Sequence, residues 1–544
     1  MTPRPFLSLP CKLRHHIYKE YFALHGGYVF QPGSGKLADA DGQPLDLALM
    51  STCSLIASET RELPFKYNSI TFSTVYHPEW RPWAGRFDYL LDCQMKQRHC
   101  LAIYLGRFLT PEITSQIEAY FPWFLPVLEH AVGQFGADIG FSDLRDSHYW
   151  GISMSLMCCP ISFHNDRPSN SALCRAVNFM LRLLAKDPEP ELSKAIEDKL
   201  RELDVRGGLS ALLDQHFGPW DIPRMSDLDD CGYRNHDGQI WQGLHDWHLG
   251  ERAQYEYRVK YCFSATSVAI RFLKHLPLNK RLFIRNVAIR EDRIAVGRPS
   301  SHALGLIPFC KENVRLKIDL QVGMLDNIFQ RTYLVRHHSV SYLERYASHD
   351  LGEQAFETAI KGVFREVKDW LNEAVCLVDA GMPAGSFTLT FEGENAIDLC
   401  SDIFKRNVLE KLATQQALER VYPRGPGKLR LNWFGWKTPT VGIEHLVNQT
   451  LFLRSNFHPR IIPNIDKIVA DRLDYDEEKW REDLTPPPWY DFSPSVHVPR
   501  LGALAIENFE RRTCSRERKA QRRRHRRHGT YRGISWWWTV MAYR

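Results

Sequence analysis

Apolar residues near the amino end of the chain recur at every fourth position. Leu9, Leu13, Ile17 and Tyr21 follow this spacing, and Pro10 is a residue that a first helical turn tolerates well. Residues four apart lie on one face of an α-helix. The pattern therefore predicts an amphipathic helix that begins at Leu9 and Pro10.

The next residues predict a loop, a second helix and a strand. Residues 31–44 are rich in Gly, Pro and Asp, which indicates a loop. Residues 70–73 alternate apolar and polar side chains, as β-strands do. Between them, a second amphipathic helix is predicted from apolar positions on one face: Leu45, Leu49, Cys53 and Ile56.

The middle of the chain mixes helical and strand patterns without a fixed repeat. Helical spacing of apolar residues is strongest over residues 352–379, and residues 395–420 predict another helix. Strands are predicted at residues 100–105, 281–289, 314–322 and 386–391. This mixture predicts an α+β fold, in which a short helical amino-terminal segment precedes a larger mixed α/β domain.

Two stretches suggest where the chain is divided. Residues 218–250 are rich in Asp, Gly, His and Trp without periodicity, and they predict a long surface loop that could split the middle domain. Prolines stiffen the region after residue 483. The predicted parts are residues 1–75, a mixed α+β domain of residues 76–483, a proline-rich spacer of residues 484–510, and a basic, disordered tail of residues 511–544.

Four short motifs occur together in the first 75 residues. They lie at residues 6–18, 49–53, 58–61 and 67–72. As a set they resemble the fungal F-box-like family called two-EXR, which is named for two Glu-x-Arg triplets. The second triplet stands here as Glu59-Thr60-Arg61, and Lys12-Leu13-Arg14 replaces the first.

The resemblance implies a docking role for the amino-terminal helices. F-box helices bind the Skp-type adaptor of cullin ubiquitin ligases, while the rest of the protein holds a substrate. The partner-binding residues would be Leu9, Pro10, Leu13, Ile17 and Leu49. The alternative is that these side chains pack on the protein's own core, because an apolar stripe can be buried within one chain or between two.

The positive charge of the chain is concentrated near its carboxyl end. The formal net charge is +6, but residues 511–532 contain eleven Lys and Arg and a single acid, Glu517. That segment carries +10, which leaves −4 on the other 522 residues. The body of the protein is mildly acidic, so its composition gives no indication of nucleic-acid binding by the folded part.

Two arginine clusters in the tail resemble a two-part nuclear import signal. The first is Arg511 and Arg512, and the second consists of Arg522, Arg523, Arg524, Arg526 and Arg527. Clustered cations repel one another, stay extended and suit the acidic groove of an import receptor. The same charges attract phosphate groups, so contact with nucleic acid is one alternative and a solvated tail without a partner is another.

No motif of known chemistry stands out. The chain has no phosphate-binding glycine loop and no Gly-x-Ser-x-Gly elbow. Metal-type side chains gather at His236, Asp237, His245, His248 and Glu251, but in a spacing that matches no metal-binding pattern, so we expect chance proximity. We therefore expect no catalytic residues, no cofactor and no metal site.

Cysteine usage and hydropathy bear on the compartment. The thirteen cysteines are scattered and form no Cys-x-x-Cys pair, which predicts an intracellular protein, nuclear or cytoplasmic. No apolar run approaches the ~20 residues that span a bilayer, so no membrane partner is expected. The sequence favours a protein–protein interaction module, and the family resemblance implies an F-box-type substrate receptor of a ubiquitin ligase. The alternatives are a nuclear nucleic-acid-binding protein that uses the tail, and an enzyme of unknown activity.

Overall fold

The computed structural model describes most of residues 6–514. The gaps are residues 136–168, 187, 204, 215–216, 235–246, 250–254, 332–359, 422–440, 460–463, 477 and 481–505. Most of the predicted proline-rich spacer and the tail after residue 514 therefore lie outside the described residues.

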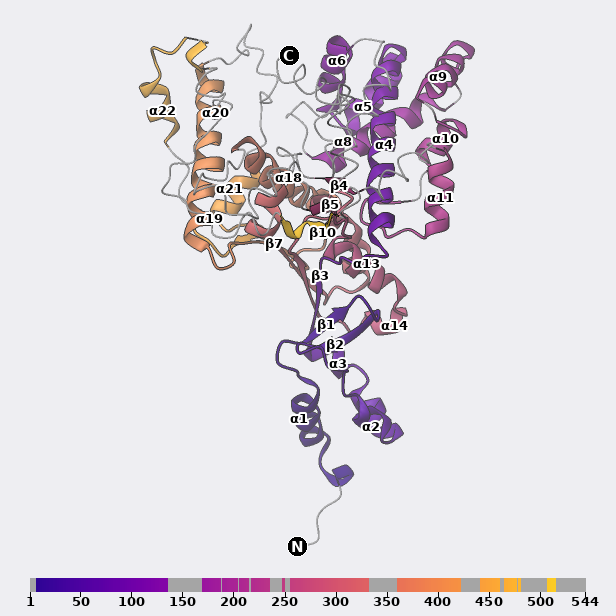
Figure 1. The fold of residues 1–544 in the computed structure, drawn as a ribbon, viewed down its shortest axis with the longest axis vertical. Coiled ribbons are helices and arrows are strands. Elements are labelled where there is room, and N and C mark those ends of the chain that lie inside the picture. Colours follow the sequence, from indigo (N-terminus) through magenta and orange to yellow (C-terminus); the bar gives the residue numbers. More distant parts are fainter. Residues whose placement is uncertain are drawn as a thin grey trace.

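A seven-stranded sheet forms the centre of the molecule (Figure 1). Its strand order is β2-β1-β3-β6-β7-β8-β9. The first two strands form an antiparallel hairpin, and all other neighbours are parallel. The strands are β1 (Tyr28–Gln31), β2 (Lys36–Asp39), β3 (Ser69–Ser73), β6 (Asn286–Glu291), β7 (Lys317–Gly323), β8 (Phe387–Glu392) and β9 (Leu453–Ser455).

The connections along this sheet cover one of its faces. From β3 to β9 the parallel strands follow one another in both sequence and space, so right-handed crossovers place their connecting elements on the same side. Every second residue of β6, β7 and β8 is buried, with Ile289 beside Leu320 and Leu320 beside Leu389. The connecting helices are α13 (Ala265–His275), α14 (Leu278–Arg281), η7 (Pro299–Leu306), α15 (Ile307–Glu312), η8 (Met324–Phe329), α18 (Ile360–Asp379), α19 (Ile397–Phe404), η9 (Lys405–Leu409), α20 (Glu410–Val421) and α21 (Val441–Val447).

A helical layer between β3 and β4 has its own core. The long helix α4 (Arg81–Leu105) joins the two cores, because Phe87 packs in the sheet core and Leu101 packs among the helices. The other members are η3 (Gly106–Phe108), α5 (Pro111–Tyr120), α6 (Phe124–Phe135), α8 (Asn170–Leu184), α9 (Pro190–Glu202), α10 (Gly208–Leu213) and α11 (Met225–Arg234).

A small antiparallel sheet joins distant parts of the chain. It consists of β4 (His248–Leu249), β5 (Tyr255–Val259) and β10 (Phe509–Thr513), in the order β10-β5-β4. Near the carboxyl end, α22 (Ile465–Asp471) packs beside α20, where Leu418 and Trp480 are buried together.

Five short helices project from the amino-terminal edge of the large sheet, at the bottom of Figure 1. They are η1 (Phe6–Ser8), α1 (Cys11–Phe22), η2 (Ala48–Ser51), α2 (Ser54–Thr60) and α3 (Leu63–Tyr67). We call these elements the N-terminal helical unit. Its sequence neighbours β1, β2 and β3 belong to the large sheet, so residues 6–75 are joined to the main domain through continuous strand pairing.

The predicted α+β class is confirmed: a helical entry precedes a larger domain that combines parallel and antiparallel strands with many helices. The strands expected at residues 70–73, 314–322 and 386–391 form as β3, β7 and β8. The helix expected at residues 352–379 forms as α18, and residues 352–359 lie outside the described part.

Three local predictions are wrong. Residues 100–105 are the last turns of α4, because a short apolar run suits a buried helix as well as a strand. The loop expected at residues 31–44 contains β2, where Gly35 adopts the left-handed conformation in the hairpin turn. The loop expected at residues 218–250 contains α11 and β4.

Two further findings concern the hydropathy and the thiols of the described residues. None of the described helices combines the length and the apolarity needed to cross a bilayer. The described cysteines are all free thiols, and most of them are buried, such as Cys100, Cys310 and Cys400.

Candidate partner-binding surface

The inner face of helix α1 is set by three residues at four-residue spacing. Arg14, Tyr18 and Phe22 are the buried residues of this helix. Tyr18 and Phe22 pack with Ile56 of α2 and Leu63 of α3 in a small separate core. Because the inner face runs through these positions, the stripe predicted from the sequence faces elsewhere.

The two central residues of the predicted apolar stripe point outward, whereas Tyr21 packs against the small core. The side chain of Leu13 is 51% exposed and that of Ile17 is 43% exposed. Pro10 is exposed as well, whereas Leu9 is half-buried and Leu49 is half-buried against the small core of the unit. Of the five predicted partner-binding residues, three are thus available at the surface.

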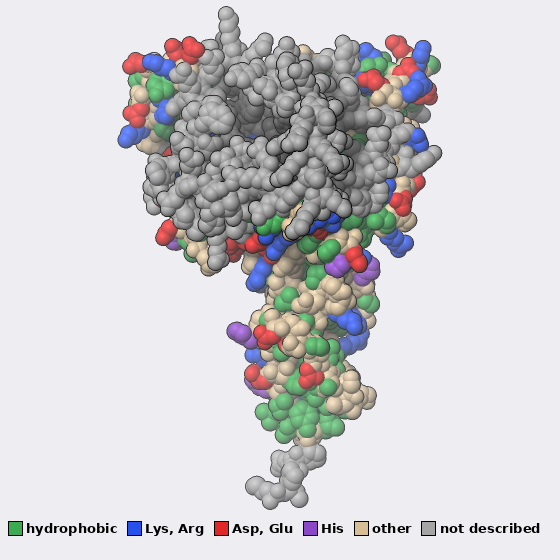
Figure 2. Space-filling view, in the orientation of Figure 1, with side chains coloured by type: hydrophobic (Ala, Val, Ile, Leu, Met, Phe, Trp, Pro, Cys, Tyr) green, Lys and Arg blue, Asp and Glu red, His purple; other side chains and the backbone are tan. Residues whose placement is uncertain are grey.

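The structure adds apolar residues that the sequence pattern did not select. Leu7, Leu47 and Leu55 are each at least 40% exposed. They belong to η1, to the residue before η2 and to α2, so no single periodicity links them. Figure 2 shows hydrophobic side chains gathered at the tip of the N-terminal helical unit.

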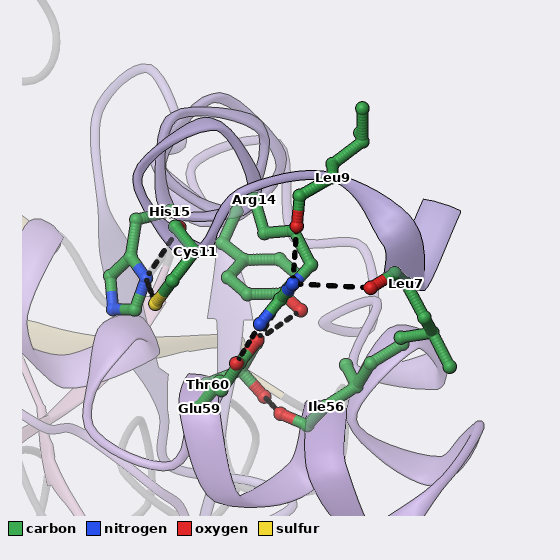
Figure 3. Close-up of polar contacts among 9 residues, drawn as sticks. Leu7, Leu9, Cys11, Arg14, His15, Ile56, Glu59 and Thr60 are labelled. Atoms are coloured by element: carbon green, nitrogen blue, oxygen red, sulfur yellow. Dashed lines mark hydrogen bonds and ion pairs between the residues drawn. The ribbon is translucent and has the colours of Figure 1, made fainter. Parts of the chain in front are cut away.

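One ion pair holds α1 and α2 together (Figure 3). Arg14 Nε donates to Glu59 Oε2 at 2.9 Å, and Arg14 Nη2 donates to Glu59 Oε1. Tyr18 Oη also donates to Glu59, at 2.8 Å. A bidentate pair of this kind fixes geometry as well as charge. The arginine of Lys12-Leu13-Arg14 thus meets the glutamate of Glu59-Thr60-Arg61.

The same guanidinium orders the chain before α1. Arg14 Nη1 donates to the carbonyl oxygen of Leu9 at 2.5 Å and to that of Leu7 at 3.3 Å. These contacts turn η1 back onto the unit and place Leu7 near the start of α1 (Figure 3). Arg14 therefore positions Leu7 and Leu9, the apolar residues that precede Pro10.

The ion pair shifts the acidity of its members. Hydrogen bonds from Arg14 and then from Tyr18 lower the pKa of Glu59 to about 2. Burial, followed by the hydrogen bond to Glu59, raises the pKa of Tyr18. The carboxylate form of Glu59 is the form that the unit requires, because both partners donate to it.

An asparagine ties the unit to the sheet. Asn68 Nδ2 donates to the carbonyl oxygens of Phe22 at 2.7 Å and Pro64 at 2.8 Å, and its Oδ1 accepts from Leu24 N. Asn68 is buried and directly precedes β3. The end of α1 is thus fixed to the residue that directly precedes β3.

The predicted import residues at the carboxyl end have a different environment. Arg511 and Arg512 belong to strand β10, which pairs with β5, so the prediction of a disordered tail from residue 511 is wrong for residues 511–513. Arg512 Nε donates to Glu256 Oε2 at 2.6 Å, and Glu256 is only 2% exposed. Arg511 is exposed, with its guanidinium 4.5 Å from the ring centre of Tyr255.

The second arginine cluster is not described by the structure. Arg522, Arg523, Arg524, Arg526 and Arg527 all follow residue 514. Their proposed role in nuclear import, like contact with nucleic acid, stays a prediction.

A polar cluster lies beneath α13 that the sequence did not indicate. Ser264 Oγ lies 2.7 Å from His302 Nδ1, and Glu291 accepts from both the backbone and the hydroxyl of Thr266. Burial lowers the pKa of His302 to about 4 and raises that of Glu291 to about 7. All four side chains are fully buried, so they join the start of α13 to η7 and β6 rather than face a substrate.

Within the described residues, no group of His, Cys, Asp and Glu side chains has an arrangement that could hold a metal ion. Of the metal-type residues noted in the sequence, His248 is the one that falls within a described element, the strand β4. The exposed apolar tip of the N-terminal helical unit is therefore the best-supported candidate site. Comparison of the chain with family models, with curated proteins and with solved structures finds no match.

Proposed function

We propose that the N-terminal helical unit is a protein–protein docking module. Its partner is the Skp-type adaptor of a cullin ubiquitin ligase, and the larger domain acts as the substrate receptor. The observation that carries the proposal is the outward position of Leu13 and Ile17, one helical turn apart on α1. Exposed apolar side chains that cluster on a projecting unit are typical of an interaction site.

The packing of the unit supports this reading of α1. The face that serves the protein's own core is formed by Arg14, Tyr18 and Phe22. Leu13 and Ile17 alternate with these residues along the helix and contribute to neither the small core nor the sheet core. Fully burying each apolar side chain against a partner gives roughly 1.5–3 kcal/mol, and these side chains have about half of that still to gain.

The test is binding of purified Skp-type adaptor to the full chain, measured by calorimetry or surface plasmon resonance. We expect Leu13→Asp with Ile17→Asp to weaken binding by about 100-fold or more, since two carboxylates would have to enter an apolar interface. Because both positions are exposed, the thermal unfolding midpoint should stay close to that of the wild type.

The matched control is Val441→Asp with Leu473→Asp, which makes the same change at exposed apolar positions on α21 and after α22. This variant should bind as the wild type does. Absence of binding by the wild-type chain would overturn the proposal. So would unfolding of the Leu13 and Ile17 variant, because that result places the stripe inside the protein.

A further inference from the structure

We infer that the partner presents carboxylates beside its apolar docking site, where they meet a basic stripe on α1. This inference rests on the proposed function and specifies the chemistry of the partner's surface. It concerns the residues that flank Leu13 and Ile17.

The stripe consists of Lys12, His16 and Lys19. Their spacing of four and then three residues places them in one line along the helix. Lys12 directly precedes Leu13, His16 directly precedes Ile17, and Lys19 follows Ile17 by two residues. All three side chains are exposed. The docking face of α1 therefore has an apolar line and, beside it, a line of nitrogen-bearing side chains, with the exposed acid Glu20 at the carboxyl end of their boundary.

The charges of the unit are unbalanced toward the positive. In helices α1, α2 and α3 the exposed charged residues are Lys12, Lys19 and Lys66 against the single acid Glu20. The remaining pair in these helices, Arg14 and Glu59, is satisfied internally. Asp46 lies nearby before η2, where it accepts a hydrogen bond from the backbone of Ala48.

Among the described residues, no side-chain hydrogen bond or ion pair involves the ammonium group of Lys12 or of Lys19, and both side chains are exposed. Opposite charges on a partner would raise the rate of encounter and fix the register of docking, and salt would screen them over ~8–10 Å. A neutral partner surface would gain nothing from this stripe. An acidic rim next to an apolar centre is the complementary surface.

The experiment measures binding of the purified adaptor to the full chain at 50 mM and at 500 mM NaCl. We expect wild-type affinity to fall by about 10-fold between the two conditions. Lys12→Glu with Lys19→Glu should weaken binding by about 30-fold at 50 mM and remove or reverse the dependence on salt. Lys12→Gln with Lys19→Gln should fall between these variants.

Two control variants separate this inference from the proposed function. Lys194→Glu with Lys467→Glu makes the same charge change at exposed lysines of α9 and α22, and should bind as the wild type does. Leu13→Ala with Ile17→Ala should weaken binding equally at both salt concentrations, because apolar contacts are not screened.

The outcomes distinguish the two claims. If the alanine variant loses affinity while the Lys12 and Lys19 charge reversal matches its control, the docking function stands and the acidic rim is overturned. Wild-type affinity that is equal at both salt concentrations overturns the rim in the same way. If the wild-type chain does not bind the adaptor under either condition, the proposed function fails and this inference fails with it.

Discussion

At each end of the described chain an arginine forms an ion pair with a glutamate, but the residues exposed beside that arginine differ. At the amino end, Arg14 pairs with Glu59 between two helices. At the carboxyl end, Arg512 pairs with Glu256 across two strands. Each arginine joins its terminal segment to the rest of the protein, so neither guanidinium is a free recognition element.

What remains at the surface depends on the side-chain periodicity of each element. In α1 the residues beside Arg14 in sequence turn outward, which exposes the apolar Leu13. In β10 successive side chains point to opposite faces, so Arg511 is exposed while Arg512 faces Glu256. The amino end therefore presents apolar area and the carboxyl end presents a cation, which favours a protein partner for the first.

The largest expected effect on this comparison comes from a substitution in the small core of the N-terminal helical unit. Phe22 is 2% exposed and packs with Tyr18 and Ile56, so Phe22→Ala should cost about 3 kcal/mol through the cavity it leaves. The expected result is loss of amide hydrogen-exchange protection in α1 while the large sheet keeps its protection.

The control for this variant is Ile17→Ala on the outer face of the same helix. Since Ile17 is exposed and outside both cores, its truncation should change the free energy of unfolding by no more than about 0.5 kcal/mol. Equal effects of the two substitutions would contradict the assignment of inner and outer faces.

A smaller effect separates the two arginines of β10. Arg512→Met should destabilise the small sheet by about 2 kcal/mol, because the buried carboxylate of Glu256 loses its ion pair with Arg512. Arg511→Met should cost no more than about 1 kcal/mol, the order of one exposed cation–π contact with Tyr255. Hydrogen exchange of β5, together with urea denaturation, measures both.

The reverse order, with Arg511 the more important residue, would show that the strand register is different. Glu510 offers an internal check, since it pairs with Arg258 directly across the same two strands. Glu510→Gln should also loosen β10. The double variant Glu510→Gln with Arg511→Met should lose no more stability than the sum of the losses of the two single variants.

The sequence correctly predicted the elements whose local pattern fits only one type of secondary structure. Alternation over residues 386–391 could only be a half-buried strand, and β8 has that pattern of burial. The apolar run over residues 100–105 is compatible with either a strand or a buried helix. It forms a helix, in which these residues of α4 pack against the other helices. Pairing between β10 and β5, more than 240 residues apart, has no local signal at all.

The candidate site was predicted in part for the same reason. Spacing identified Leu13 and Ile17 as one face of a helix, but it could not say whether that face is inner or outer. Arg14 and Tyr18 decide this, through contacts with Glu59 over 40 residues away. A charged residue on the buried side of an amphipathic helix runs against the simple expectation, so the apolar stripe alone left both orientations of the helix open.

The smallest expected effect is a pH dependence confined to the amino end. Because the hydrogen bonds of Arg14 and Tyr18 lower the pKa of Glu59 from 4.5 to about 2, the folded unit favours the carboxylate. The stabilisation is fully present above pH ~4.5 and is lost as the pH falls toward 2. Methyl NMR signals of Leu13 and Ile17, followed from pH 6 to pH 2, should therefore report loosening of α1 in this range.

Glu59→Gln should abolish this transition and leave the unit looser at neutral pH. Glu20→Gln, on the exposed side of α1, should instead show the same pH-dependent transition as the wild type. Identical profiles for the wild type and Glu59→Gln would show that the ion pair does not hold the two helices together, and the outward position of the apolar residues would then need another cause.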